Sequence, residues 1–455
     1  MIHPRLAVCS ALLVALSLAA CGDGDSTTSN GDLSDAEDVR SEQAPDRTEG
    51  EVGAEVEPDD RVVTTPPLAP EPSAAEASTT TASDTTEATS PPDTTIAAGI
   101  GWERVPSDDE VFDGEGRQSI NAVTIGGPGF VAVGVDDTAG AAWTSIDGLA
   151  WSRSRDDAGV FSGESRHELN SIAAGGPGLV AVGIDGIGGA VWTSPDGETW
   201  SRASDPGLVL GGSQEIHGIV AADPGLVAVG SAFDIAGSNA TIWTSPDGTN
   251  WTRQLIPKTD PAEVHATMNA VIVGGPGLIA VGFISTGGDE DAAVWTSPDG
   301  VTWTRVPHDE AVFGGPDGQT MEAVTVGGPG LVAVGQDYNG DGVGAAVWTS
   351  PDGLAWTKVP SNQDTFGGSQ ARGMWGVIAD GSGLVAVGAV SSGSAIWTSP
   401  DGSVWTWVPQ NQGAFDKDGG VIHGITATAS RLVAVGQDYS SSDAYATVWV
   451  KDTSG

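Results

Sequence analysis

Residues 337–342 have the clearest spacing in the chain for binding an ion. Asp337, Asn339 and Asp341 place oxygen-bearing side chains at alternate positions, and the following Gly342 permits a sharp bend, as in calcium-binding loops. The twelfth position of such a loop normally carries a glutamate that binds calcium with both oxygens, but here it is Trp348. The segment therefore predicts an incomplete calcium site or, as its Asn, Asp and Gly content favours, a hairpin turn.

The residue spacings of common catalytic sites do not occur in the sequence. Its histidines form no His-x-His or His-Glu-x-x-His pattern, so a catalytic zinc is not expected. No phosphate-binding loop, nucleophile elbow or dinucleotide fingerprint is present either. The two cysteines, Cys9 and Cys21, both lie near the start of the chain, so disulfides and thiolate metal sites are not expected after residue 21. Apart from calcium, no cofactor is expected.

A segment that begins and ends with tryptophan recurs along the chain, as in residues 192–200. Its centre, Ser194-Pro195-Asp196-Gly197, is typical of a tight turn, because Pro fixes φ at the second position and Gly takes the left-handed conformation. Strand-forming residues flank this turn, so each copy predicts a hairpin of two strands. Further copies start at Trp143, Trp243, Trp295, Trp348 and Trp397.

A second repeat precedes each hairpin. In one copy, residues 175–178 (Gly-Gly-Pro-Gly) join two further apolar runs, so the full unit has four strands, here called a, b, c and d in chain order. The first tryptophan of the hairpin recurs up to Trp449, at intervals of roughly 50 residues. Four short strands per unit at this period are typical of a β-propeller. The sequence therefore predicts an all-β fold, a seven-bladed propeller.

The two ends of this region predict how the ring closes. Residues 102–105 look like a strand d with no strands a, b or c before them, and residues 448–450 look like a strand c with no strand d after them. Pairing the N-terminal strand with the last blade would leave no open sheet edge. The propeller is therefore predicted to span residues 99–455, with its N-terminal strand completing the last blade.

The Thr-Ser-Pro-Asp-Gly-x-x-Trp segments resemble the Asp-box, or bacterial neuraminidase repeat, which occurs in sialidases and in many non-enzymatic propellers. The family separates its Asp and Gly by one residue, whereas the two are adjacent here. The resemblance implies a structural role at the c–d hairpin, away from a sialidase active site. The structural aspartates that it implies are Asp147, Asp196, Asp247, Asp299, Asp352 and Asp401.

The same resemblance implies which residues a sialidase-like glycoside hydrolase would need: three arginines for the substrate carboxylate and a tyrosine nucleophile paired with a glutamate. Arg117, Arg166 and Arg372 each precede a strand a, and Glu322 and Tyr338 belong to one blade. The family's Arg-Ile-Pro motif is absent, however, and Arg372 is displaced by one position. An exo-alpha-sialidase-like hydrolase is therefore the alternative rather than the first interpretation.

Loop variability indicates where a ligand would bind. The a–b and c–d turns are nearly constant, whereas the d–a and b–c connections vary, and in a propeller these two connections lie on the same face. Strand a begins near that face. When the seven copies of strand a are aligned, one position carries a polar residue in most of them. Its side chains would either satisfy backbone groups between blades or line a ligand site. The residues at this position are Asn121, Asn170, His217, Asn269, Glu322, Trp375 and His423.

The first part of the chain predicts that the protein is exported and attached to a membrane. Residues 1–21 resemble a bacterial lipoprotein signal peptide, with a short apolar stretch followed by Leu18-Ala19-Ala20-Cys21, and Cys21 would carry the lipid. Residues 22–98 are rich in Asp, Glu, Ser, Thr, Ala and Pro, which predicts a disordered acidic tether. We expect a protein anchored outside the cytoplasm, on the cell membrane or the outer membrane.

A formal net charge of −43 argues against nucleic acid as a partner. The first interpretation is a monomeric, non-catalytic recognition or scaffold propeller of the cell envelope, which binds an unknown protein or glycan through the variable-loop face. A sialidase-like hydrolase is the first alternative. A calcium-dependent adhesion or envelope-maintenance protein is the second.

Overall fold

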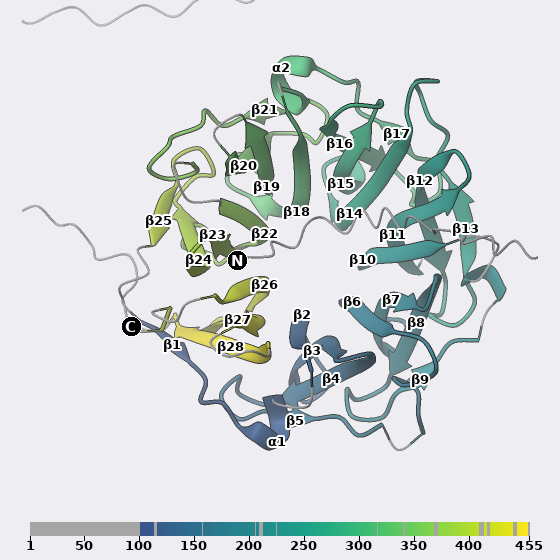
Figure 1. Cartoon of the computed structure of the whole chain (residues 1–455), viewed down its shortest axis with the longest axis vertical. Helices are drawn as coiled ribbons and strands as arrows, with labels where there is room; N and C mark the ends of the chain where they lie inside the picture. Colours follow the sequence, from purple (N-terminus) through teal and green to yellow (C-terminus); the bar gives the residue numbers. More distant parts are fainter. Residues whose placement is uncertain are drawn as a thin grey trace, which may run out of the picture. The chain divides into compact units, whose positions relative to one another are not determined.

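In a computed structural model, the chain forms a seven-bladed β-propeller whose blades surround one axis (Figure 1). The structure describes residues 101–453 except 113–115, 157, 205, 209–212, 224, 316, 340–341, 368–371, 409–413, 416–418 and 440–443. The predicted signal peptide (1–21) and tether (22–98) lie outside the described residues. In the part that is described, no helix is both long and apolar enough to cross a membrane.

Each blade is an antiparallel sheet of four strands, with strand a nearest the axis. Blade 1 contains β2 (Gln118–Gly126), β3 (Gly129–Asp136), β4 (Ala139–Ser145) and β5 (Ser152–Arg153). Blade 2 contains β6 (His167–Gly175), β7 (Gly178–Asp185), β8 (Gly188–Ser194) and β9 (Ser201–Arg202). Blade 3 contains β10 (Gln214–Ala222), β11 (Gly225–Asp234), β12 (Gly237–Ser245) and β13 (Thr252–Leu255).

The remaining blades repeat this order. Blade 4 contains β14 (His265–Gly274), β15 (Gly277–Ser285), β16 (Glu290–Ser297) and β17 (Thr304–Arg305). Blade 5 contains β18 (Gln319–Gly327), β19 (Gly330–Asn339), β20 (Gly342–Ser350) and β21 (Thr357–Lys358). Blade 6 contains β22 (Arg372–Ala379), β23 (Leu384–Val390), β24 (Gly393–Ser399) and β25 (Thr406–Val408). Blade 7 contains β26 (Val421–Ala427), β27 (Arg431–Asp438), β28 (Tyr445–Asp452) and β1 (Trp102–Arg104).

Blade 7 confirms the predicted closure. Its outermost strand is β1, from the N-terminal end of the propeller. This strand pairs antiparallel with β28, so that Trp102 lies opposite Lys451 and Arg104 lies opposite Trp449. Trp102 is buried and packs edge-on against Phe415, with ring centroids 6.2 Å apart. The ring is therefore closed by residues from both ends of the described chain.

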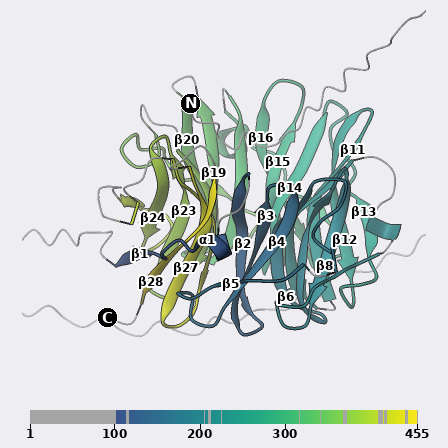
Figure 2. The same ribbon diagram turned by 60° about the horizontal axis from the view of Figure 1, so that its bottom comes forward.

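The strands run between two faces of the propeller, which Figure 2 shows from the side. The turn face carries the short a–b and c–d turns, and the loop face carries the d–a and b–c connections. The described d–a connections include α1 (Asp109–Phe112), η1 (Pro206–Leu208) and α2 (Glu310–Phe313). Each strand a therefore begins at the loop face and ends at the turn face.

The core lies between blades and is rich in tryptophan. In the cluster between blades 1 and 2, Val131 and Val133 of one blade pack with Leu169 and Trp192 of the next. Each first-arm tryptophan of the hairpins is at most 2% exposed. Five of these indoles also donate a hydrogen bond to a d–a connection, as Trp143 Nε1 does to the Val111 carbonyl at 2.8 Å. They are therefore core residues that also hold the loop face in place.

A β-bulge interrupts strand a at the same point in every blade. In blade 1 the register skips Asn121, because Ile120 pairs with Gly134 and Ala122 with Val133. The same skip occurs in the other six blades. The bulged residues are Asn121, Asn170, His217, Asn269, Glu322, Trp375 and His423. These are the seven equivalent positions identified from the sequence, called the axial ring below.

Candidate loop-face site

The axial ring lies on the seven innermost strands around the propeller axis (Figure 1). Its three asparagines tie one blade to the next. Asn121 Nδ2 donates to the Leu169 carbonyl at 3.1 Å, and Asn170 Nδ2 donates to the Ile216 carbonyl at 3.0 Å. Asn269 makes the equivalent bond to the carbonyl of Met321 at 3.0 Å. These three side chains satisfy inter-blade backbone groups, as one of the two interpretations of the ring predicts.

The other ring members have different neighbours. Glu322 accepts hydrogen bonds from Asn269 Nδ2 at 3.2 Å and from the Thr320 hydroxyl at 3.0 Å. Trp375 and His423 meet edge to face, with ring centroids 6.4 Å apart. Blades 5, 6 and 7 therefore bring a carboxylate, an indole and an imidazole to three consecutive positions of the ring, where the sequence predicted ligand-binding candidates.

Two carboxylates beside the ring were missed by the sequence analysis. Glu168 and Glu215 lie two residues before the ring positions of blades 2 and 3, on the same side of the strand. Burial and the neighbouring charge of Glu168 raise the pKa of Glu215 to about 7, while Arg166 opposes the rise. Glu168 is paired with Arg166 and accepts a hydrogen bond from Asn121. The alternation of side chains along a strand is the signal that could have found them.

Arg117, Arg166 and Arg372, the candidates for a sialidase-like arginine triad, have three different sets of partners. Arg117 Nε donates to Gln437 Oε1 of blade 7 at 3.1 Å, and Arg166 pairs with Glu168. The guanidinium of Arg372 is buried and lies 4.5 Å from the ring centre of Trp407 on the outer strand β25. The three guanidinium groups thus engage separate partners, on blade 7, on β6 and on β25.

Tyr338 and Glu322, the candidate nucleophile pair, both belong to blade 5. The Tyr338 hydroxyl donates to Gln336 Oε1 at 2.9 Å, two residues away on the same strand. Glu322 has the partners in the axial ring already described. These contacts place the two side chains on different strands of the blade, Tyr338 on β19 and Glu322 on β18.

Aspartates near the end of strand b are held within their own blades. Asp337, the first residue of the predicted calcium segment, pairs with Lys358 Nζ at 3.1 Å and accepts from Gln319 Nε2 at 2.9 Å. The side chain of Asn339 and the whole of Asp341 lie outside the described part of the structure. Equivalent ion pairs lie in blades 1, 2 and 7: Asp136–Arg153, Asp185–Arg202 and Asp438–Arg104.

A group of side chains suited to a metal lies on the loop face at blade 4. Asp291, His308 and Glu310 each offer a ligand atom, and these atoms all lie within 4.8 Å of one another. Burial raises the pKa of Asp291, Glu310 and Asp289 add to the rise, and His308 opposes it. This group was not predicted from the sequence, because Asp291 and the pair His308 and Glu310 lie on either side of a hairpin.

The turn face is built from polar groups that satisfy one another. In the turn after β16, Asp299 Oδ1 accepts from the amides of Val301 at 2.9 Å and Thr302 at 2.6 Å, and the Ser297 hydroxyl accepts from the Gly300 amide at 2.8 Å. The Trp303 indole donates to the Gly300 carbonyl at 2.9 Å. These bonds recur in all six hairpins. The aspartates are thus structural, while assignment to the Asp-box repeat stays a prediction.

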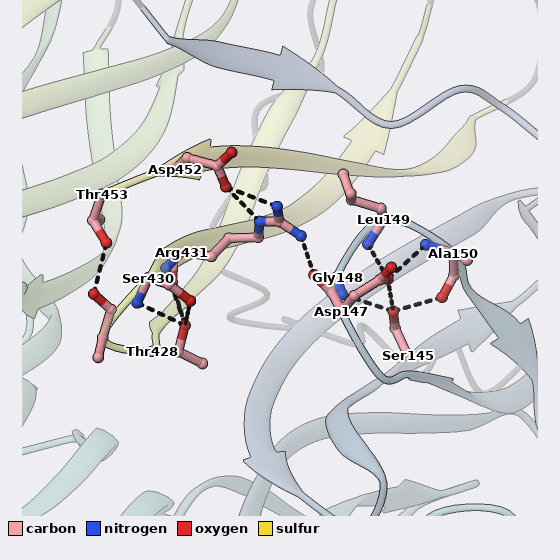
Figure 3. Close-up of polar contacts among 11 residues, drawn as sticks. Ser145, Asp147, Gly148, Leu149, Ala150, Thr428, Ser430, Arg431, Asp452 and Thr453 are labelled. Atoms are coloured by element: carbon pink, nitrogen blue, oxygen red, sulfur yellow. Dashed lines mark hydrogen bonds and ion pairs between the residues drawn. The ribbon is translucent and has the colours of Figure 1, made fainter. Parts of the chain in front are cut away.

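Blade 7 lacks the Gly-Pro-Gly turn and uses Arg431 instead (Figure 3). Arg431 Nε and Nη2 each lie 2.8 Å from Asp452 Oδ1, and Nη1 donates to the carbonyl of Asp147 in blade 1. The Thr428 hydroxyl accepts from the Arg431 amide at 3.0 Å. The side chain therefore joins the last blade to the first on the turn face.

The turn face also has a shallow depression between blades 5 and 6, with a volume of about 570 Å³. Gly, Pro, Ala and Ser supply most of its lining. Asp401 also lines it, but its Oδ1 accepts from the amides of Ser403 and Val404. The depression therefore presents few groups with which to recognise a polar ligand.

The chain is similar to several solved structures. A GH74 xyloglucanase from Xanthomonas campestris is 15% identical over 74% of this chain and 53% of its own, with a TM-score of 0.42. An unknown-function protein from Dyadobacter fermentans is 11% identical over 78% and 98%, with a TM-score of 0.43. A Trypanosoma rangeli sialidase is 15% identical over 73% and 54%, with a TM-score of 0.39. The chain spans about half the length of the xyloglucanase and the sialidase.

No curated protein matches the chain. A family model described as the DUF6242 beta propeller domain matches residues 102–379, which is more than half of the sequence. That range starts at the closing strand β1 and ends with β22, the innermost strand of blade 6. The chain therefore belongs to the DUF6242 beta propeller family.

Proposed function

We propose that the protein is a lipid-anchored recognition or scaffold propeller of the cell envelope, which binds a protein or glycan through its loop face without catalysing a reaction. The observation that carries this proposal is the grouping of Glu322, Trp375 and His423 at consecutive positions of the axial ring. An indole with a few polar groups beside it is typical of binding sites for proteins and small molecules.

The contrast between the two faces supports the choice of the loop face. On the turn face, the turn aspartates and serines use their oxygens on backbone amides of the same turn. On the loop face, Trp375 is half-buried in the ring, and the connections around it differ in length and content. Recognition residues are commonly placed on such variable connections above a rigid scaffold.

The separate partners of the three arginines support binding over hydrolysis. A sialidase-like site needs guanidinium groups that converge on one carboxylate, as the resemblance implied, whereas Arg117, Arg166 and Arg372 each engage a different partner. The hydroxyl of Tyr338 donates to Gln336, a neighbour on its own strand. For these reasons glycoside hydrolysis is not the proposed function.

A capture experiment tests the proposal. The full chain is immobilised and mixed with solubilised envelope of its host, beside the variant Glu322→Ala/Trp375→Ala. We expect the unaltered chain to retain one protein or glycan that the variant loses by about 10-fold or more, because recognition is concentrated in a few central residues.

The matched control is Glu198→Ala/Val301→Ala, which changes two exposed residues of the turn face. It should capture as much as the unaltered chain. Equal capture by the axial-ring variant, with its melting temperature unchanged, would place recognition elsewhere. Turnover of a fluorogenic sialoside by the unaltered chain, lost in Tyr338→Phe, would replace the proposal with hydrolysis.

Attachment to the membrane is tested separately. Cys21→Ser removes the thiol that the lipid would occupy, so the variant should move from the membrane fraction to the soluble fraction of the host. The propeller begins after residue 98 in our assignment, so its melting temperature should not change. A variant that still sediments with membranes would contradict lipid anchoring through this cysteine.

A further inference from the structure

Three side chains with metal-binding chemistry meet where blade 4 reaches the loop face. Asp291 is the second residue of β16, the strand that follows the b–c connection. His308 and Glu310 come after β17, where the chain leaves blade 4 for blade 5, and Glu310 opens the short helix α2. The c–d hairpin joins β16 to β17, so the start of one strand lies beside the exit of the other.

The distances among these side chains are close to what one ion requires. His308 Nε2 lies 3.2 Å from Glu310 Oε2, and all three ligand atoms lie within 4.8 Å of one another. Zinc binds nitrogen and carboxylate oxygen at about 2.0–2.2 Å, which places tetrahedral ligand atoms about 3.4 Å apart. The His308–Glu310 pair already has this separation, and a change in the side-chain torsions of Asp291 would complete it.

The backbone around the ligands is well fixed. Asp309 caps α2 by accepting a hydrogen bond from the Ala311 amide at 3.0 Å, which sets the first turn where Glu310 lies. The imidazole of His308 lies beside the buried ring of Phe313, with centroids 6.4 Å apart. Asp291 is held in β16 by its pairing with Ile284. The ligands therefore come from ordered elements and not from one mobile loop.

The chemical character of the group selects the class of ion. One imidazole nitrogen and two carboxylate oxygens suit divalent transition metals, whereas calcium takes oxygen ligands only. Asp289 adds negative charge two residues from Asp291. His308 and Glu310 are exposed, so an ion can reach the group from solvent and keep a water or a ligand atom in its remaining position.

We propose that Asp291, His308 and Glu310 form a binding site for a divalent transition-metal ion, with zinc as the best fit. In the bound form the ion takes the place of the Nε2 proton between His308 and Glu310, and the two carboxylates balance its charge. The site lies on the loop face but stands independently of the function proposed above, because it rests on a different group of side chains.

Calorimetric titration with zinc chloride tests the site. The full chain is freed of metal with a chelator and titrated beside His308→Gln. We expect one saturable high-affinity equivalent in the unaltered chain, and a loss of affinity of at least about 100-fold in the variant. Loss of a ligand should cost at least as much as the 10–100-fold typical of residues that only support a ligand.

His265→Gln is the matched control, because His265 starts β14 in the same blade but lies outside the group. It should keep the high-affinity equivalent. Cobalt gives a second readout: the visible absorption of a bound cobalt ion should appear in the unaltered chain and in His265→Gln, and disappear in His308→Gln.

Glu310→Gln is a second ligand variant that distinguishes loss of a metal ligand from misfolding. The Glu310 side chain is exposed, so its replacement leaves the core intact. It should also weaken zinc binding, with the melting temperature of the metal-free protein unchanged. The proposal is overturned if the unaltered chain shows no saturable zinc equivalent, or if Glu310→Gln and His308→Gln bind zinc as tightly as His265→Gln does.

Discussion

At the scale of single residues, the axial ring depends on a glycine that faces it from strand b. In blade 5, Gly335 pairs with Met321 beside the bulge at Glu322, and a Cβ on Gly335 would lie 1.9 Å from the carbonyl oxygen of Thr320. The corresponding glycines of the other six blades would place a Cβ within 2.0 Å of a backbone oxygen. The Ala-Val-Gly segment that recurs within strand b is therefore a condition for the bulge.

Gly335→Ala should destabilise the propeller by about 3 kcal/mol or more, because the added methyl group meets a fixed backbone oxygen and the strand must move. Chemical denaturation of the full chain measures the change. Gly288→Ala is the matched control, since a Cβ there meets nothing within 4 Å. Equal midpoints for the two variants would show that strand a adjusts to a side chain opposite the bulge.

At the scale of elements, the c–d turns depend on ionised aspartates. Asp299 accepts amide hydrogen bonds from Thr302 and Val301, and these bonds lower its pKa to about 2. The corresponding aspartates of the other five turns have lowered pKa values for the same reason. A charged acceptor strengthens such a bond, so protonation weakens every turn at once.

The free energy of unfolding should therefore fall as the pH drops from about 4 to 2. The folded-state pKa is lowered, so its contribution is complete above the ordinary value of 3.8 and is lost as the pH falls through about 2. Asp299→Asn should reduce stability near neutral pH and show a smaller loss on acidification, measured by urea denaturation at several pH values. Glu198→Gln, which also removes a turn-face carboxylate, should retain the full loss.

At the scale of the whole molecule, adjacent blades interlock on the turn face. A Cβ on Gly127, in the a–b turn of blade 1, would lie 2.5 Å from the Asp196 carbonyl in the c–d turn of blade 2. The same approach recurs at Gly275 and Gly328 toward Asp352 and Asp401. Blade 7 replaces this close approach with the bond from Arg431 to the Asp147 carbonyl (Figure 3).

Arg431→Ala should lower the free energy of unfolding by about 1 kcal/mol, because it removes the ion pair with Asp452 and the inter-blade bond together. The denaturation midpoint measures this loss. Arg155→Ala, which removes an exposed arginine of a d–a connection, is the control and should leave the midpoint unchanged. A null result for Arg431→Ala would mean that the strand pairing alone closes the ring.

The fold could be predicted from the sequence because each unit repeats its turns and its tryptophans, and because residues 102–105 supply the missing last strand. Alignment of the seven units identified the positions of the axial ring. The bulge at these positions could not be predicted, because it is defined by the pairing register between strands a and b. The group of Asp291 and His308 was missed for a similar reason. Its members are separated by a hairpin, and only the pairing of β16 with β17 brings them together.

The position of β1 also has a mechanical consequence. Any pull transmitted along the chain from the residues before 101 enters the propeller at this strand, whose only sheet partner among the described strands is β28. Three residue pairs and the buried side chain of Trp102 resist that pull. Tension on the N-terminal side would therefore load the closing strand before any other, and its detachment would open the circle of blades.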